Sequence, residues 1–167
     1  MDNEAGIATG WLDSPLSAVG IEQARARGER HRAHVNAVHS SDLGRAIETV
    51  TLAFAGVDTP TYMDARLREC NYGSLNGGPS AEVHAVRLEH LDKPYPGGES
   101  YRDVVARVAS FLSDLASQAD GERILVIAHS ATRFALEHLL TGVPLETVVR
   151  ESGEWRPGWE YHLKVAT

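Results

Sequence analysis

The sequence predicts an α/β fold in which helices cover both faces of a largely parallel β-sheet, a three-layer sandwich. Short apolar segments alternate along the chain with stretches of helical spacing, which is the order of elements typical of such folds. The run from Ile124 to Ala128 contains no polar residue and no alternation, as expected of a strand covered on both faces. With 167 residues, of which 43% are hydrophobic, the chain has the size and composition of one globular domain over residues 1–167.

Composition excludes several classes of protein. The formal net charge of −7 makes the chain a poor binder of nucleic acid. Its longest apolar run, residues 124–128, is too short to cross a bilayer, and no basic start followed by an apolar stretch marks a secretory signal. Cys70 is the single cysteine, which excludes an intramolecular disulfide and a multi-cysteine zinc site. We therefore expect a cytoplasmic protein with no nucleic-acid or membrane partner.

The first third of the chain is predicted to form two helices and two short strands. Ser17 is placed to cap a helix that runs to about His34. Residues 35–39 are β-prone, and residues 40–42, Ser-Ser-Asp, are good caps for the next helix. The apolar positions of this second helix have helical spacing: Leu43, Ala46, Ile47 and Val50. Residues 59–63 form the second strand candidate.

Glycine and proline divide the middle of the chain. Residues 65–79 are predicted to be an irregular loop, residues 80–91 a weaker helix and residues 92–98 a second loop. Ser100 and Asp103 then form a capping box for a strong amphipathic helix. The apolar stripe of this helix is Val104, Val108, Phe111, Leu112 and Leu115.

The last third begins with the apolar strand at residues 124–128. A helix follows from Ser130 to Thr141, with Gly142 as its stop signal. Residues 159–165 alternate between apolar and polar side chains, which predicts a strand with one wetter face.

In parallel sheets of this kind the site lies beyond the carboxyl ends of the strands, where two residues stand out. Arg45 lies in the first turn of a helix, where free amides and a guanidinium together favour a phosphate or carboxylate. The alternative is a surface arginine paired with Glu48. His129 lies between a buried strand and a helix start, where burial and the helix dipole favour a neutral imidazole that can act as nucleophile, base or donor. The alternative is a structural histidine.

Weaker signals come from two loops. Glu69 enters the irregular loop, where a partly buried carboxyl group can act as a general acid, although a salt bridge with Arg66 or Arg68 explains it equally well. Three residues before the first helix either bind a ligand or form an ordinary connection: Asn3, Thr9 and Gly10. Cys70 is interpreted as an inert apolar residue.

Together these segments resemble the histidine phosphatase superfamily, also called the phosphoglycerate-mutase-like family. The resemblance runs in family order over almost the whole chain, and the Ser-Ser-Asp-Leu-Gly-Arg-Ala segment at residues 40–46 is its most specific part. The other matching positions are Asn3, Thr9 to Trp11, Pro15 to Ser17, Gly20, Gln23, Ala24, Leu67 to Glu69, Gly73, Gly97 to Ser100, Arg107 and Ile124 to His129.

The resemblance implies an enzyme that acts on a small phosphorylated substrate. A histidine attacks the phosphomonoester and is phosphorylated, a carboxyl group protonates the leaving alcohol, and water then cleaves the phosphohistidine. Carried over, Arg45 and His129 bind the phosphoryl oxygens, and Glu69 is the general acid and base. Four further residues match positions around the phosphate and the substrate: Asn3, Thr9, Gly10 and Ser130. No metal and no cofactor are implied, because arginine and histidine supply the positive charge and the donors.

One part of the family pattern does not match. The family chain begins with a strand that ends in Arg-His-Gly, a few residues before the position of Asn3, and that histidine is the nucleophile. No histidine of this sequence corresponds to it. We therefore expect that Met1 is a wrongly assigned start, that the natural protein is longer, and that the sheet of this chain lacks its first strand.

Three alternatives to a phosphatase remain open. Family mutases carry a longer, arginine-rich insertion where only 27 residues separate Glu69 from Gly97, so the length favours a phosphatase over mutase-type phosphoryl transfer. The chain as it stands is otherwise a non-catalytic phosphate-binding remnant. Ser130 also follows a strand in the manner of a serine-hydrolase nucleophile, but the glycines of that motif are replaced by Ala128 and Thr132. The sequence predicts neither the natural substrate nor the oligomeric state.

Overall fold

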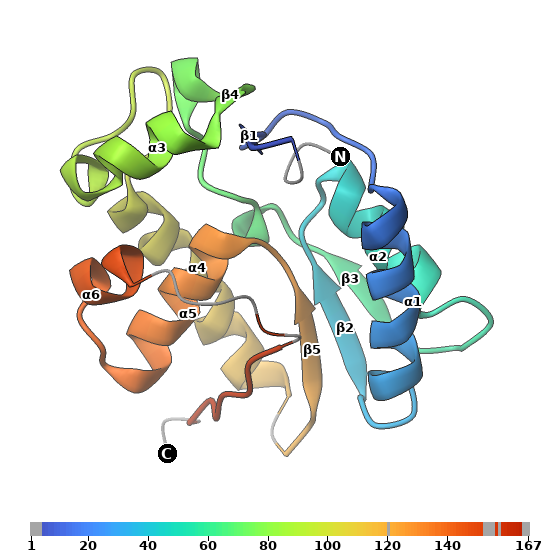
Figure 1. The fold of residues 1–167 in the computed structure, drawn as a ribbon. Helices are drawn as coiled ribbons and strands as arrows, with labels where there is room; N and C mark the ends of the chain where they lie inside the picture. Colours follow the sequence, from blue (N-terminus) through green and yellow to red (C-terminus); the bar gives the residue numbers. More distant parts are fainter. Residues whose placement is uncertain (1–4, 120, 152–155, 157, 165–167) are drawn as a thin grey trace.

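Three parallel strands form the central sheet of the computed structural model, which describes residues 5–119, 121–151, 156 and 158–164. The middle strand is β2 (Ala37–Ser40), with β3 (Thr61–Met63) on one side and β5 (Ile124–Ile127) on the other. Because all three run in the same direction, their carboxyl ends meet at one edge of the sheet (Figure 1).

Helices cover both faces of this sheet (Figure 1). One face carries α1 (Ala18–His31) and α2 (Gly44–Ala53), and the other carries α4 (Tyr101–Gln118) and α5 (Ser130–Thr141). The short α6 (Leu145–Arg150) packs against α5. This arrangement confirms the predicted α/β sandwich.

Local signals in the sequence set the ends of the main helices. The hydroxyl of Ser17 accepts a hydrogen bond from the amide of Gly20 at the start of α1. The capping box of Ser100 and Asp103 starts α4 as predicted. Gly142 ends α5 with a φ of 78°, in the left-handed region that glycine tolerates best. Gly28 allows α1 to approach α2, since a Cβ there would lie 1.9 Å from the carbonyl oxygen of Ala53.

The sequence patterns do not predict several short elements. β1 (Ile7–Ala8) pairs antiparallel with β4 (Gly78–Pro79), and two 3-10 turns, η1 (Ala65–Leu67) and η2 (Gly73–Leu75), lie in the region predicted to be wholly irregular. The predicted helix at residues 80–91 divides into α3 (Ser80–Val86) and a 3-10 turn, η3 (Arg87–His90). Elements of two to seven residues are too short to show a hydrophobic period.

The predicted strand at residues 159–165 is wrong over the residues described. Residues 158–164 have no regular secondary structure, and Val165 lies outside the described part. The alternate side chains pack on α5 instead of a neighbouring strand: Trp159 lies against the guanidinium of Arg133, and the hydroxyl of Tyr161 donates to Glu137. Alternation marks a strand only where a partner strand supplies its hydrogen bonds.

Two other expectations need correction. In β5 only Ile127 is buried, whereas the three preceding apolar residues are half-buried, because β5 pairs with β2 alone among the described strands. Residues 40–42 do not provide the cap of α2. Leu43 occupies the N-cap position without a side-chain bond, and the hydroxyl of Ser41 accepts from the amide of Leu43 instead. No helix in the described part of the chain is long and apolar enough to cross a membrane.

Candidate active site at the carboxyl ends of the strands

Glu69 lies at the start of α5, against the two residues that follow His129. The carboxylate of Glu69 accepts hydrogen bonds from the amides of Ser130 at 3.1 Å and Ala131 at 3.0 Å, the first two residues of the helix. Its own neighbour, Cys70, donates a third at 2.8 Å. A carboxylate at a helix N-terminus is favoured by the free amides and by the helix dipole. The fold therefore brings a residue 60 positions away in the sequence to the side of His129.

The expected alternative for Glu69, a salt bridge with a neighbouring arginine, is not what these arginines form. Arg66 pairs with Asp64 and Asp114, and Arg68 pairs with Asp42. The carboxylate of Glu69 is thus held by backbone amides.

His129 is half-buried, and its Nε2 atom is enclosed without a hydrogen-bond partner among the described residues. Burial, reinforced by the positive charges of Arg45 and Arg107, lowers the pKa of His129 to about 3, although Asp42 opposes the shift. The imidazole is consequently neutral at pH 7, as the sequence predicts. A buried polar atom without a partner is uncommon and indicates a place for a ligand atom or a water molecule.

Arg45 lies in the first turn of α2, where the sequence predicts it. Its guanidinium donates to the carbonyl oxygens of Gly10 at 2.8 Å and Leu12 at 3.0 Å, and its charge acts on His129. The carboxylate of Glu48, the partner considered in the alternative, accepts from the amide of Leu16. Arg45 thereby joins the loop before α1 to the region of the sheet edge.

The loop at residues 9–12 is joined to the site by the hydrogen bonds that Arg45 donates to it. Gly10 is buried with a φ of 52°, and a Cβ there would lie 1.9 Å from the Oδ1 atom of Asn76. Thr9 is half-buried and its carbonyl accepts from the amide of Leu12. Ser130 is exposed at the start of α5 and contacts Glu69 through its backbone. Asn3 lies outside the described residues.

Sequence reasoning missed the residues that hold the Glu69 loop. The indole of Trp11 donates to the carbonyl oxygen of Glu69 at 2.7 Å, and Arg68 stacks on the same indole while bonding both oxygens of Asp42 at 2.6 Å. The buried hydroxyl of Thr132 donates to the carbonyls of Leu67 and Arg68. No local sequence pattern around Thr132 predicts this contact. Arg107, which also bonds this loop, stands out in the sequence only through the family resemblance.

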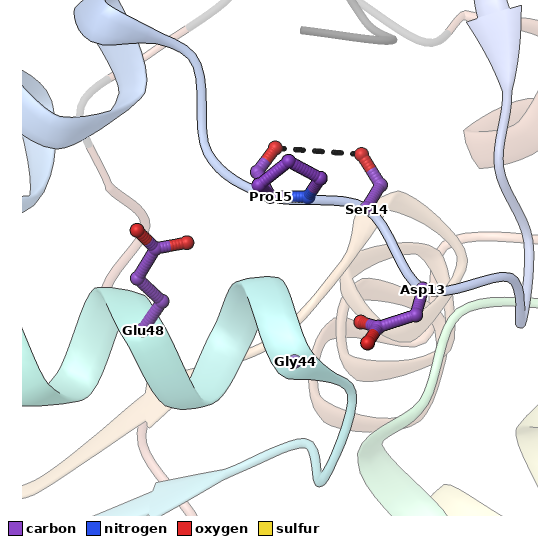
Figure 2. Close-up of a pocket in the computed structure, with 5 residues that line it drawn as sticks. All are labelled: Asp13, Ser14, Pro15, Gly44 and Glu48. Carbon is purple, nitrogen blue, oxygen red and sulfur yellow. Dashed lines mark hydrogen bonds between the residues drawn. The ribbon is translucent and has the colours of Figure 1, made fainter.

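A hollow of about 310 Å³ lies beside the first turn of α2, lined by Asp13, Ser14, Pro15, Gly44 and Glu48 (Figure 2). The side chain of Asp13 is directed toward Gly44. This hollow adjoins Arg45 along the chain, but neither His129 nor Glu69 lines it.

Cys70 and the other potential ligands add no further chemistry. The Cys70 thiol is fully buried, and burial beside Glu69 and Glu99 raises its pKa well above the ordinary range. Such a thiol is protonated and a poor nucleophile. Within the ranges that the structure describes, no group of three His, Cys, Asp or Glu side chains is placed to hold a metal ion.

The fold and this site define a class of protein that the comparisons with known sequences name. A profile of the histidine phosphatase superfamily (branch 1) matches residues 1–153. The chain belongs to this superfamily, whose members include phosphatases and phosphoglycerate mutases.

Relatives of both kinds match at similar identity. A 2,3-bisphosphoglycerate-dependent phosphoglycerate mutase of Methylobacterium sp. (strain 4-46) is 37% identical over 163 residues, covering 87% of this chain and 78% of the relative. A protein of Hydrogenobacter thermophilus, named as a candidate phosphoserine phosphatase, is 35% identical over 155 residues, covering 87% and 76%.

Solved structures agree with the fold. A structure titled mycobacterial hydrolase 1 superposes with a TM-score of 0.79 at 26% identity, covering 90% of this chain and 79% of that one. The mycobacterial glucosyl-3-phosphoglycerate phosphatase complexed with VO3 superposes with a TM-score of 0.78 at 27% identity, covering 88% and 79%.

Proposed function

We propose that this chain carries the phosphate-binding and acid–base residues of a phosphomonoester hydrolase that works through a phosphohistidine intermediate on a small phosphorylated substrate. The observation that carries the proposal is that Glu69 accepts hydrogen bonds from the first amides of α5, directly after His129 in the chain, whose Nε2 atom is enclosed and unpartnered among the described residues. Arg45 adds a positive charge to the same region. Charge on a transferring phosphoryl group is stabilised by preorganised donors of this kind.

The reaction is a pair of displacements at phosphorus. In the first, a histidine nitrogen forms a P–N bond as the ester P–O bond breaks, and Glu69 gives its proton to the leaving alcohol. In the second, water attacks phosphorus, the P–N bond breaks, and Glu69 accepts the proton of the water. Arg45 and His129 bind the phosphoryl oxygens throughout. The three amides that donate to Glu69 are the contacts of a carboxylate, the form required in the second displacement.

We place the phosphoryl-accepting histidine on a strand that lies along the outer edge of β5. The support is that Ile124, Leu125 and Val126 are half-buried although apolar, and that β5 pairs with β2 alone in the described part of the chain. A parallel strand at that edge would end beside His129. His39, the one histidine on a described strand, packs against the rings of Tyr62 and Phe111 and does not serve this purpose.

Phosphatase and mutase chemistry differ in whether water reaches the phosphohistidine. Only 27 residues separate Glu69 from Gly97, which favours a site open to water and hence hydrolysis. Sequence identity does not distinguish the two activities, since the mutase and the candidate phosphatase are 37% and 35% identical to this chain. Release of inorganic phosphate from phosphoglycerates, measured against interconversion of the phosphoglycerates, distinguishes the two activities.

The test compares p-nitrophenyl phosphate hydrolysis by this chain and by one extended at its N-terminus with the family's Arg-His-Gly strand. We expect the extended chain to turn over, and both Arg45→Ala and His129→Ala to lower kcat/KM at least a hundredfold, the scale typical of lost transition-state contacts. Arg102→Ala, an exposed change on α4, serves as the control. An extended chain that folds but does not hydrolyse the ester contradicts the proposal.

A non-catalytic phosphate-binding protein is the second candidate, because no histidine of this sequence corresponds to the family nucleophile. It predicts saturable binding of phosphate or vanadate without turnover in either chain. A serine hydrolase using Ser130 predicts instead turnover of p-nitrophenyl acetate and none of p-nitrophenyl phosphate. The cytoplasmic location stays a prediction.

A further inference from the structure

We propose that Arg107 and Glu99 are positioning residues that fix the Glu69 carboxylate against the start of α5. Both come from the region of α4: Glu99 directly precedes its cap, and Arg107 lies on the helix. The loop that carries Glu69 has no regular hydrogen-bond ladder of its own between Arg68 and Tyr72. Its position therefore depends on side chains from elsewhere in the fold.

Arg107 uses three of its five N–H donors to bond the backbone of this loop and the other two to bond Glu99. Nη1 donates to the carbonyl oxygens of Arg66 at 2.7 Å and Arg68 at 2.8 Å, and Nη2 donates to that of Glu69 at 3.0 Å. Nε and Nη2 donate to the two carboxylate oxygens of Glu99, at 2.9 and 3.1 Å. A planar fork of five fixed donors is a property of arginine that lysine cannot reproduce.

Glu99 completes the arrangement on the far side of Glu69. Its Oε2 atom accepts from the amide of Asn71 at 2.9 Å, and its own amide donates to the carbonyl oxygen of Asn71 at 2.8 Å. The backbone is thus bonded before, at and after Glu69. With both sides fixed, the carboxylate reaches the amides of Ser130 and Ala131 from a defined direction.

The pair is far more enclosed than the ion pair of Arg102 with Asp92. The side chains of Arg107 and Glu99 are 15% and 18% exposed, whereas those of Arg102 and Asp92 are 54% and 75% exposed. Charged hydrogen bonds that are shielded from water hold their geometry better than exposed ones. Arg102 is consequently a matched control: the same residue type, on the same helix, in a pair with an acidic side chain.

The expected consequence for catalysis rests on the proposed function, in which Glu69 transfers the proton of the leaving alcohol. A misplacement of about 1 Å can lower a rate by about a hundredfold. A poor leaving group needs this proton more than a good one, so loss of position should slow phenyl phosphate more than p-nitrophenyl phosphate.

The first arm of the test measures amide hydrogen exchange in this chain, comparing wild type, Arg107→Lys, Glu99→Gln and the control Arg102→Lys. We expect the Ser130 and Ala131 amides to lose at least tenfold more protection than the amides of β2 in the Arg107 and Glu99 variants, with no change at either place in the control. Unchanged protection at these two amides overturns the proposal. An equal loss throughout the fold does so too, because it shows a general stabilising role instead.

The second arm measures hydrolysis by the N-terminally extended chain. We expect Arg107→Lys to lower kcat for phenyl phosphate about tenfold more than kcat for p-nitrophenyl phosphate, with similar KM values. An equal fall for both esters contradicts the positioning role in catalysis. If the extended chain hydrolyses neither ester, the proposed function fails, and the exchange result still decides whether Arg107 and Glu99 hold Glu69.

Discussion

The loop that carries Glu69 and the strand end that carries His129 lie side by side, but they differ in how fully their polar side-chain atoms are hydrogen-bonded. Both oxygens of the Glu69 carboxylate are hydrogen-bonded, and its backbone is held by Trp11, Arg107 and Glu99. The Nε2 atom of His129, in contrast, is enclosed without any partner among the described residues.

This difference separates what the protein itself supplies from what a ligand supplies. The acid and base group is held in place before any substrate arrives. Burial and neighbouring positive charge keep the imidazole neutral. Its Nε2–H group can therefore donate a hydrogen bond to a phosphoryl oxygen without first releasing another partner. Preorganisation of this kind lowers the cost of reorganisation during the reaction.

The largest loss of stability is expected when the carboxylate of Glu99, which helps to hold the Glu69 loop, is removed. Glu99→Ala leaves the guanidinium of Arg107 enclosed without its charged partner, which should lower the free energy of unfolding by about 3 kcal/mol. Chemical denaturation measures the change. Asp92→Ala, which breaks the exposed pair with Arg102, should cost less than about 1 kcal/mol, and equal losses in the two variants would contradict the contrast drawn here.

The buried, unpartnered His129 should affect how the free energy of unfolding depends on pH. His129 has a pKa of about 3 when folded and about 6.5 when unfolded, so below pH 6.5 the unfolded chain binds a proton that the folded chain does not. Stability due to neutral His129 is complete above pH 6.5 and falls as the pH drops toward 3, by about 1.4 kcal/mol per pH unit. Between pH 6 and 4 wild type should therefore lose stability more steeply than His129→Gln by roughly this amount. Identical slopes would mean that His129 takes up a proton in the folded protein.

A smaller change tests the second attachment of the Glu69 loop. Thr132→Val keeps the shape of a fully buried side chain but removes the hydroxyl that donates to Leu67 and Arg68, which should cost about 1 to 2 kcal/mol. Denaturation of this variant measures the loss. Thr141→Val, at an exposed hydroxyl near the end of the same helix, is the comparison and should change little.

The smallest effect is expected where α5 meets the C-terminal segment. Tyr161→Phe removes one hydrogen bond to Glu137 and should lower the free energy of unfolding by about 0.5 kcal/mol, because both groups remain partly accessible to water. Thermal unfolding detects such a change. A loss as large as that of Thr132→Val would show that residues 158–164 are as firmly attached as the Glu69 loop.

How far the sequence predicts this molecule depends on the range of the interactions involved. The helices at Ser17 and Ser100 follow from caps, and the helix from Ser130 follows from its periodicity and its glycine stop, all of which act within a few residues. The segment at residues 159–164 misleads because its alternation is real, but the contacts that decide its conformation are with α5.

The site shows the same division. Arg45 and His129 stand out because their positions relative to a strand and a helix start can be read locally. The bonds of Glu69 to Ser130 and Ala131, and those of Arg107 to residues 66–69, span about 40 to 60 positions and leave no local pattern. The family resemblance supplied Glu69 its role, but only the folded chain shows what holds it.

The central claim is that Arg45 and His129 form one phosphoryl site beside Glu69. Titration of this chain with vanadate, followed through the imidazole ¹⁵N signals of its histidines, tests it most directly. We predict a saturable change at Nε2 of His129 that Arg45→Ala abolishes while Arg102→Ala leaves it intact. Saturable vanadate binding that leaves His129 unchanged, or no binding at millimolar vanadate by a folded chain, would contradict the claim.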